Sequence, residues 1–197
     1  LYSSYVFTGL LVWTWFQNAL FQATGVIISS RPLIRQPGFP SAILPIVVVT
    51  TGLVHFVLAL PVLMIFLLLD GARLTPLVLV LPLLQLIQFA LTVTLAYFLA
   101  ALNVTFRDTQ HTLGVVLQFL FYLTPIFYDL QNIPDQYWSI YGLNPMVHIV
   151  TCYRQILIWG VAPDWLALVI ISGCTLLLLP MGYLLFKRQS LRFVEEI

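Results

Sequence analysis

Residues 46–69 read IVVVTTGLVHFVLALPVLMIFLLL and contain no Asp, Glu, Lys or Arg. A helix needs about 20 predominantly apolar residues to cross the hydrocarbon core of a bilayer. This stretch is long enough, and the uncharged run that contains it extends from Gln36 to Leu69. It therefore predicts a membrane-spanning helix, and the same criterion divides the rest of the chain.

The composition of the whole chain excludes most classes of soluble protein. Of the 197 residues, 61% are hydrophobic and 8% are charged, and the mean hydropathy is +1.02. Soluble domains average about 25% charged residues, so these few charges cannot cover a water-exposed surface. A net charge of +1 argues against a nucleic-acid partner, and two cysteines are too few for a disulfide scaffold. The composition predicts an all-α integral membrane protein.

Charged residues separate five long uncharged runs. These are residues 1–30, 36–69, 74–106, 109–128 and 165–186. Each run is long enough to span a bilayer. We expect a single transmembrane domain over residues 1–197, with spans at about 5–28, 46–69, 76–101, 110–128 and 165–186.

The segment before the last run has a different character. Its apolar part, residues 145–159, would form a helix only about 22 Å long, against a hydrocarbon core of about 30 Å. Apolar residues recur there at helical spacing, which is typical of an amphipathic helix with one wet face; they are Met146, Ile149, Val150, Tyr153, Ile156 and Leu157. We predict an outer re-entrant helical hairpin over residues 129–162. The alternative is a helix that lies flat in the interface.

The distribution of basic residues predicts the orientation. With five spans, one side holds Arg31, Arg35, Arg107, Lys187, Arg188 and Arg192, and the other holds only Arg73 and Arg154. The positive-inside rule places the more basic side, with the C-terminus, in the cytoplasm. The first span then starts outside with Leu-Tyr-Ser-Ser and without a Met. We therefore expect one further span upstream, which would make six in the intact protein.

The loop after the first span, residues 31–45, reads RPLIRQPGFPSAILP. Four prolines and a glycine exclude a spanning helix there. Its apolar side chains and flanking arginines favour a short helix that docks into a groove of a soluble partner. Packing of the same side chains against lipid headgroups is the alternative.

Five stretches of this chain resemble, in order, the permease subunits of ABC exporters of bacterial polysaccharides, which include O-antigen, capsule and teichoic-acid exporters. They are FTGLLVWTWFQNAL with RPLIRQPGFPSAILP, then FRDTQH at 106–111, FYLTPIFY at 121–128 and LNPMVHIVTCYRQIL at 143–157. The chain departs from the family pattern at Gln36, at Pro37-Gly38 and at Ser41.

The resemblance implies a homodimeric permease of the bacterial inner membrane that exports a lipid-linked polysaccharide. Residues 31–44 would form the coupling helix that docks into a separate ATPase subunit, present in two copies. The coupling residues carried over are Arg31, Leu33, Ile34, Arg35, Phe39 and Pro40. The chain contains no phosphate-binding G-x-x-x-x-G-K-[ST] motif, so ATP and Mg²⁺ would belong to the partner.

Two further groups are candidates for contact with the cargo. Arg107, next to Asp108, ends an uncharged run, and with Arg31 it could hold the diphosphate of a lipid-linked glycan. The alternative is that the two charged residues only mark the end of a membrane span, with Asp108 capping the next helix. Trp13, Phe16 and Tyr122 could line a channel in which sugar rings stack on aromatic planes. Ordinary helix packing is the alternative for each ring.

The remaining ionisable residues suggest no catalytic or metal site. His55 lies within a predicted span, where one interhelical hydrogen bond is the simplest role. The histidines and cysteines lack metal-ligand spacing. Three other functions stay open: a drug or lipo-oligosaccharide efflux permease, a secondary transporter, and a membrane-embedded transferase that would use Asp108 and His111.

Overall fold

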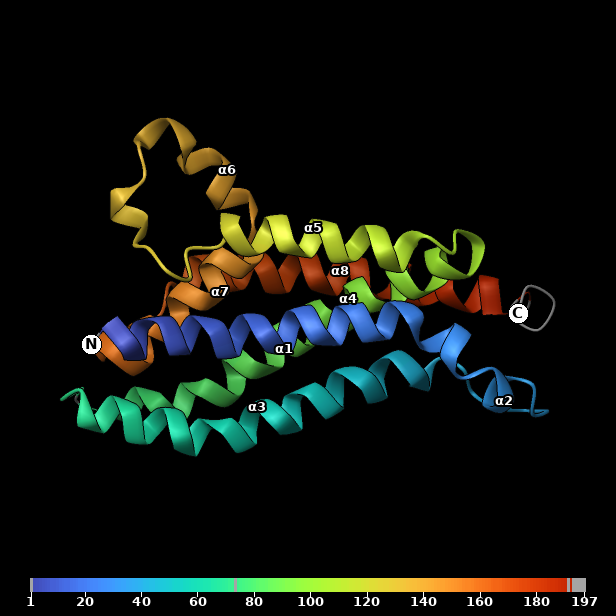
Figure 1. Ribbon diagram of the computed structural model, residues 1–197, viewed down its shortest axis with the longest axis horizontal. Coiled ribbons are helices and arrows are strands. Elements are labelled where there is room, and N and C mark those ends of the chain that lie inside the picture. The colour runs from blue at the N-terminus through green and yellow to red at the C-terminus, as the bar shows by residue number, and fades with distance from the viewer. Residues whose placement is uncertain (1, 73, 191, 193–197) are drawn as a thin grey trace.

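The computed structural model describes residues 2–72, 74–190 and 192, and within them every regular element is helical. Five long helices run side by side along one axis (Figure 1): α1 (Tyr2–Ser29), α3 (Ile43–Leu69), α4 (Leu81–Thr105), α5 (Thr109–Leu123) and α8 (Trp165–Ser190). A 3₁₀ segment, η1 (Pro76–Val80), leads into α4. The predicted all-α architecture is confirmed.

Three of these helical segments are long and apolar enough to cross a membrane: Ile43–Leu69, Pro76–Thr105 and Trp165–Ser190. They correspond to the spans predicted at 46–69, 76–101 and 165–186. Helix α1 has 28 residues and no charge, but its polar side chains lower its hydropathy. Helix α5 has only 15 residues and is about 22 Å long. The described residues therefore support three spans by length and composition.

Helix α5 ends five residues before the predicted span boundary at 128. It ends at Leu123, and Thr124 is extended, with φ −97° and ψ 127°. The residue before a proline is disfavoured in the α region, and Pro125 follows directly. The backbone therefore leaves the helix before Pro125, and only residues up to Leu123 of the span predicted at about 110–128 are helical.

The loop after α1 is less helical than the predicted helix at 31–44. Only α2 (Arg31–Ile34) is helical before α3 begins at Ile43. Gly38 has φ +79°, a conformation that favours glycine, and Pro37 and Pro40 interrupt helical hydrogen bonding on either side of it. The segment is thus one helical turn followed by a loop.

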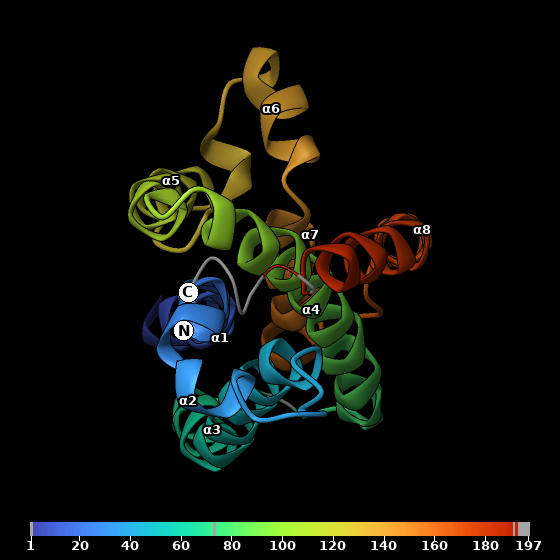
Figure 2. The same cartoon turned by 90° about the vertical axis from the view of Figure 1, so that its right-hand side faces the viewer.

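Helix α1 packs against several other helices, and half of its 28 residues are buried. Figure 2 shows α1 end-on, with α3 below it, α5 above it and α4 and α7 to its right. The approach to α3 is close at Gly52, where a Cβ would stand 2.7 Å from Cδ1 of Trp15. The indole N–H of Trp15 donates to the carbonyl of Val49 at 3.3 Å. A side chain at position 52 would push these two helices apart.

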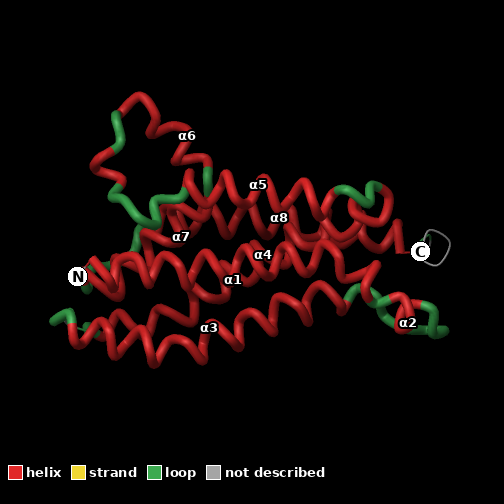
Figure 3. The backbone as a smooth tube through the Cα atoms, viewed as in Figure 1, coloured by secondary structure: helices red, strands yellow, loops and turns green. Residues whose placement is uncertain are grey.

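The segment between α5 and α8 leaves the bundle and returns to it. Helix α6 (Trp138–Leu143) stands away from the bundle near the end that holds the start of α1, and loops connect it on both sides (Figures 1 and 3). Helix α7 (Pro145–Arg154) and the π-helical turn η4 (Gln155–Trp159) pack back against the bundle. The apolar face predicted for this helix is buried, as expected for an amphipathic helix.

Two ends of the bundle can be distinguished. Helix α2, the α4–α5 turn and the end of α8 lie at one end (Figure 1). The start of α1, the α3–α4 connection and residues 124–164 lie at the other. The elements that carry the six basic residues assigned to one side lie at the first end, and Arg154 lies toward the second. Arg73, which was assigned to the same side as Arg154, lies outside the described residues.

Candidate translocation path and coupling surface

A groove between α1 and α3 carries polar side chains on two long helices. Its volume is about 170 Å³. The polar lining consists of Thr14, Asn18 and Gln22 from α1 and of Thr51 and His55 from α3. All five residues are exposed in the single chain.

Three of the groove's side chains need a partner from outside the described chain. Asn18, Gln22 and His55 make no hydrogen bond to any residue that the structure describes. An unsatisfied polar group in the hydrocarbon core costs several kcal/mol. This face of α1 therefore has to contact water, a ligand or another protein surface.

The three aromatic residues predicted to line a channel lie in different environments. Trp13 and Phe16 are buried inside the chain, and the Trp13 ring centroid lies 5.5 Å from that of Phe16 and 6.0 Å from that of Phe121. Tyr122, on α5, is 64% exposed. Of these three rings only Tyr122 is placed to meet a ligand directly, and their role in transport stays a prediction.

The predicted coupling residues divide into an exposed set and a packed set. Leu33 is 43% exposed, and Arg35 and Pro40 are exposed as well; we call these three residues the loop surface. Ile34 is buried and Phe39 packs against the core. The hydroxyl of Tyr97 on α4 donates to the carbonyl of Ala42 at 2.8 Å, which fixes the end of the loop to the bundle.

Arg31 opens the same segment at the end of α1. Its side chain is half-buried, and its Nε is buried without a hydrogen-bond partner among the described residues. The Nε–H of Arg31 can therefore donate a hydrogen bond to a ligand or partner at the end of the bundle where α2 lies.

The α4–α5 turn places Arg107 and Asp108 on the surface at the same end (Figure 1). Asp108 occupies the N-cap position of α5, but its side chain makes no capping hydrogen bond. Instead, Oδ1 of the buried Asn103 accepts the backbone N–H of Gln110 at 3.0 Å. Nothing in the sequence marked Asn103 as the capping residue.

Gln110 also connects this turn to α1. Its Nε2 donates to the carbonyl of Phe21 at 3.0 Å. A Cβ at Gly25 would stand 2.6 Å from the amide of Gln110, so the glycine makes room for this contact. The position of the α4–α5 turn is therefore coupled to that of α1.

Arg154 is buried, although the charge count treated it as an outer surface charge. It is 1% exposed, and carbonyl groups surround its guanidinium. Nη2 donates to the carbonyls of Tyr5 at 3.2 Å and Ile126 at 2.9 Å, and Nη1 donates to that of Pro125. The Tyr5 ring centroid lies 3.5 Å from the guanidinium carbon. Arg154 therefore ties α7 to α1 and to the segment after α5, and it does not lie on a wet face.

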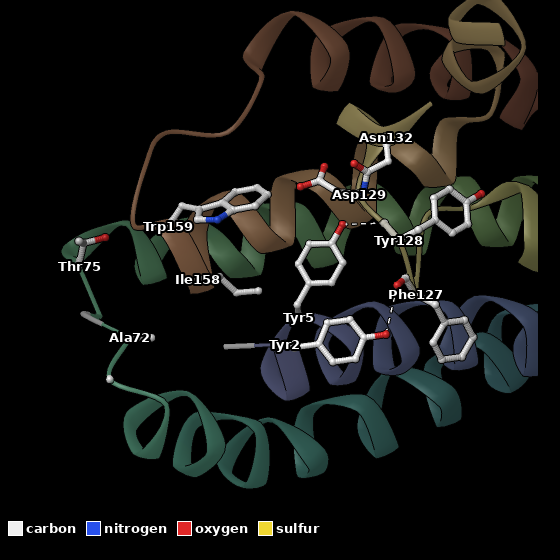
Figure 4. Close-up of a pocket in the computed structure, with 11 residues that line it drawn as sticks. Tyr2, Tyr5, Ala72, Thr75, Phe127, Tyr128, Asp129, Asn132, Ile158 and Trp159 are labelled. Atoms are coloured by element: carbon white, nitrogen blue, oxygen red, sulfur yellow. Dashed lines mark hydrogen bonds between the residues drawn. The ribbon is translucent and has the colours of Figure 1, made fainter. Parts of the chain in front are cut away.

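A large cavity opens at the end of the bundle where α1 begins. It has a volume of about 920 Å³ and is drawn in Figure 4. Five aromatic residues line it, together with the polar residues Thr75, Asp129 and Asn132; the aromatic ones are Tyr2, Tyr5, Phe127, Tyr128 and Trp159. A second cavity of about 360 Å³ shares Asp129 and Trp159 with the first. We call the two together the outer-end cleft.

The sequence matches the protein family described as ABC-2 type transporter over residues 2–158, which includes α1 to α7. It is 35% identical over 195 residues to the O-antigen export system permease protein RfbA of Myxococcus xanthus, covering 98% of this chain and 75% of that protein. It is 26% identical over 196 residues to RfbA of Klebsiella pneumoniae, with the same coverage of 98% and 75%. The polysialic acid transport protein KpsM of Escherichia coli is 31% identical over 86 residues, 44% of this chain and 33% of that protein.

Proposed function

Because the chain belongs to the ABC-2 type transporter family, we propose that it is the membrane-spanning subunit of an ATP-driven exporter that moves a lipid-linked polysaccharide across the bacterial inner membrane. The observation that carries the proposal is the similarity to a curated O-antigen export permease over 98% of this chain. The second relative with a polysaccharide cargo, KpsM, points to the same class of substrate.

The permease works with a separate ATPase subunit, in two copies, and as a homodimer. The chain has no phosphate-binding loop, so ATP and Mg²⁺ bind to the partner. The loop surface of Leu33, Arg35 and Pro40 supports docking of that partner, because it combines an exposed apolar side chain with a cation beside it. Ile34 and Phe39 support the loop from below.

All five long helices cross the membrane in this proposal, with the C-terminus in the cytoplasm. Helix α1 spans in spite of its polar side chains, because these contact a hydrated path or a second protein surface. Helix α5 is short, so it spans together with the extended segment after Leu123. The α6–α7 hairpin is re-entrant from the outer side, and contacts of α7 with α1 and α4 support this reading.

The polysaccharide moves along the polar face of α1. The side chains of Thr14, Asn18 and Gln22 offer donors and acceptors to hydroxyl groups without any charge that would hold the polymer tightly. Arg31 and Arg107 lie at the cytoplasmic end, where guanidinium groups can bind the diphosphate of the lipid carrier. Asp108 limits the net positive charge beside Arg107.

Reconstitution tests this function. The full-length permease is co-expressed with each ATPase encoded near it, and the purified complex is placed in proteoliposomes. We expect co-purification, ATP hydrolysis, and ATP-dependent transfer of lipid-linked polysaccharide to the opposite leaflet. Stable complexes that move hydrophobic drugs but no glycan would contradict the substrate, and transport driven by an ion gradient without ATP would contradict the mechanism.

A further inference from the structure

We propose that the outer-end cleft is a saccharide-binding site that holds sugar rings of the cargo between Trp159 and Asp129. The inference rests on the proposed function for the identity of the ligand. The site itself is defined by the cavities on either side of these two residues.

The aromatic residues of the cleft are held in place before any ligand binds. The hydroxyl of Tyr5 donates to the carbonyl of Tyr128 at 2.9 Å, and that of Tyr2 donates to the carbonyl of Phe127 at 3.2 Å (Figure 4). The hydroxyls of Tyr128 and Tyr141 lie 3.1 Å apart. Fixed rings lose little conformational freedom on binding, which favours affinity for a weakly held ligand.

The indole of Trp159 offers a plane for stacking. It is 49% exposed, and its ring centroid lies 6.5 Å from that of Tyr5. One face of a pyranose ring presents C–H groups, which pack on the negative face of an aromatic ring. Trp159 borders both cavities, so successive sugar rings on either side of it can contact the same indole.

Asp129 supplies the polar part of the site. One carboxylate oxygen, Oδ1, accepts the backbone N–H of Gln131 at 3.3 Å, and no hydrogen bond to the other oxygen occurs within the described residues. A carboxylate accepts hydrogen bonds from vicinal hydroxyls, and such charge-assisted bonds are stronger than neutral ones. Asn132 and Gln131 add amide groups beside it. A sugar ring that stacks on Trp159 therefore finds hydrogen-bond acceptors of the protein beside its hydroxyl groups.

The lining distinguishes this cleft from an apolar groove on the same chain. A groove between α4 and α8 is lined almost only by apolar and aromatic residues, among them Leu86, Phe89 and Leu179. A lipid tail in the outer-end cleft would leave the carboxylate of Asp129 desolvated, at a cost of several kcal/mol. A ligand with both C–H faces and hydroxyls satisfies aromatic rings and carboxylate together.

Direct binding to the full-length permease tests the site. The protein is placed in nanodiscs of phosphatidylethanolamine and phosphatidylglycerol, free of alkyl-glycoside detergents, whose sugar headgroups would compete. The probe is an oligosaccharide of a few repeat units released from the surface polysaccharide of the source bacterium. Saturation-transfer NMR measures its affinity without ATP or the ATPase subunit.

We expect Trp159→Ala to weaken binding at least about fivefold and Asp129→Asn about tenfold. Trp159→Phe keeps an aromatic plane, and we expect it to stay within about threefold of the wild type. Asn at position 129 keeps an acceptor for the N–H of Gln131, so the local fold is preserved. Trp165→Ala is the matched control: Trp165 is 48% exposed and borders neither cavity, so its loss leaves binding within about twofold.

Several results would overturn the site. These are no binding by the folded wild type, equal affinity in the wild type and Asp129→Asn, or an equal loss in Trp165→Ala. If none of these variants binds differently while ATP-dependent glycan export continues, the site is wrong and the proposed function stands. If the oligosaccharide binds as described but no ATPase drives transport, the proposed function fails and the binding site stands.

Discussion

Gly9 of α1 leaves the space that the guanidinium of Arg154 occupies. A Cβ at position 9 would stand 2.6 Å from Nη2 of Arg154 and 3.4 Å from a methyl carbon of Ile126. The arginine cannot move aside cheaply, because its donors are bound to carbonyl groups of α1 and of the segment after α5. Gly9, the smallest kind of residue, therefore lies against Arg154, the only arginine that is buried among the described residues.

Gly9→Ala tests this relationship through stability. The added methyl group displaces a guanidinium that makes charge-assisted hydrogen bonds, so we expect a loss of about 2 kcal/mol or more. Gly173→Ala is the matched control, because position 173 lies in α8 with nothing within 4 Å of a Cβ there. That change is neutral or stabilising by up to about 1 kcal/mol. Thermal unfolding of the purified full-length proteins measures both, and equal midpoints would contradict the prediction.

Arg154→Lys tests whether the guanidinium shape matters or only its charge. A lysine ammonium is a point charge and cannot reach the carbonyls of Tyr5, Pro125 and Ile126 with the same planar geometry. We expect Arg154→Lys to lower stability nearly as much as Arg154→Met, by about 3 kcal/mol. The lysine variant must also loosen α7, measured as faster hydrogen exchange in residues 145–154. Wild-type stability in the lysine variant would show that charge alone suffices.

The sequence predicted the helical frame because each long helix lies in an uncharged run, apart from the last turn of α8, which carries Lys187 and Arg188. The break at Pro125 was also predictable, since a proline restricts the residue before it. The buried Arg154 was not predictable, because the acceptors around it come from residues 28, 29 and 149 positions away along the chain. A charge count treats every arginine as solvated, and only tertiary packing reveals a cage of carbonyls.

The candidate site was predictable only in part, because it too depends on tertiary packing. Asn18 lies five residues after Trp13, about 140° around the helix, so the two side chains are on different faces. Helical spacing separates these faces, but it did not show that the one with Trp13 is packed inside the chain and the one with Asn18 faces outward. The outer-end cleft combines residues that are far apart in the sequence, such as Tyr2 and Trp159. No local pattern joins such residues, so a cavity of this kind appears only when the chain is folded.

The loop surface makes a prediction about coupling. Leu33 is exposed, so Leu33→Asp should leave thermal stability within about 0.5 kcal/mol of the wild type. The same change places a charge in an apolar interface, and we expect at least a tenfold loss in recovery of the ATPase subunit on co-purification. Phe39→Ala is the contrasting variant, because Phe39 packs against the core and its loss lowers stability first. Unchanged recovery of the ATPase with Leu33→Asp would exclude this loop as the docking surface.

Arg107 makes a prediction about the lipid carrier. A guanidinium binds a diphosphate in a bidentate manner and an ammonium does not, so we expect Arg107→Lys to lower export about tenfold and Arg107→Ala further. Export is measured in proteoliposomes at equal amounts of inserted protein. Asp108→Asn raises the local positive charge and leaves export at least at the wild-type level. If export is equally insensitive to both changes at position 107, this arginine is only a topological stop.

The polar face of α1 makes a prediction about water access. Asn18 and Gln22 are replaced one at a time by cysteine, and the exposed native Cys174 is first changed to serine. Cys152 can stay, since burial raises its pKa to about 11 and keeps the thiol protonated at neutral pH. Thiosulfonate reagents react with the thiolate, which forms only where water reaches the side chain.

We expect cysteines at positions 18 and 22 to react with a membrane-impermeant thiosulfonate in the assembled transporter. The control is Leu176→Cys on α8, because Leu176 is 69% exposed on a helix that is long and apolar enough to span a membrane, and we expect it to face lipid. Its rate should be at least about a hundredfold lower, since a thiolate in hydrocarbon pays a large desolvation cost. Added oligosaccharide should slow the reaction at position 18 if the polymer follows this face. Equal rates at positions 18 and 176 would mean that α1 turns its polar side chains toward protein, and the path would have to lie elsewhere.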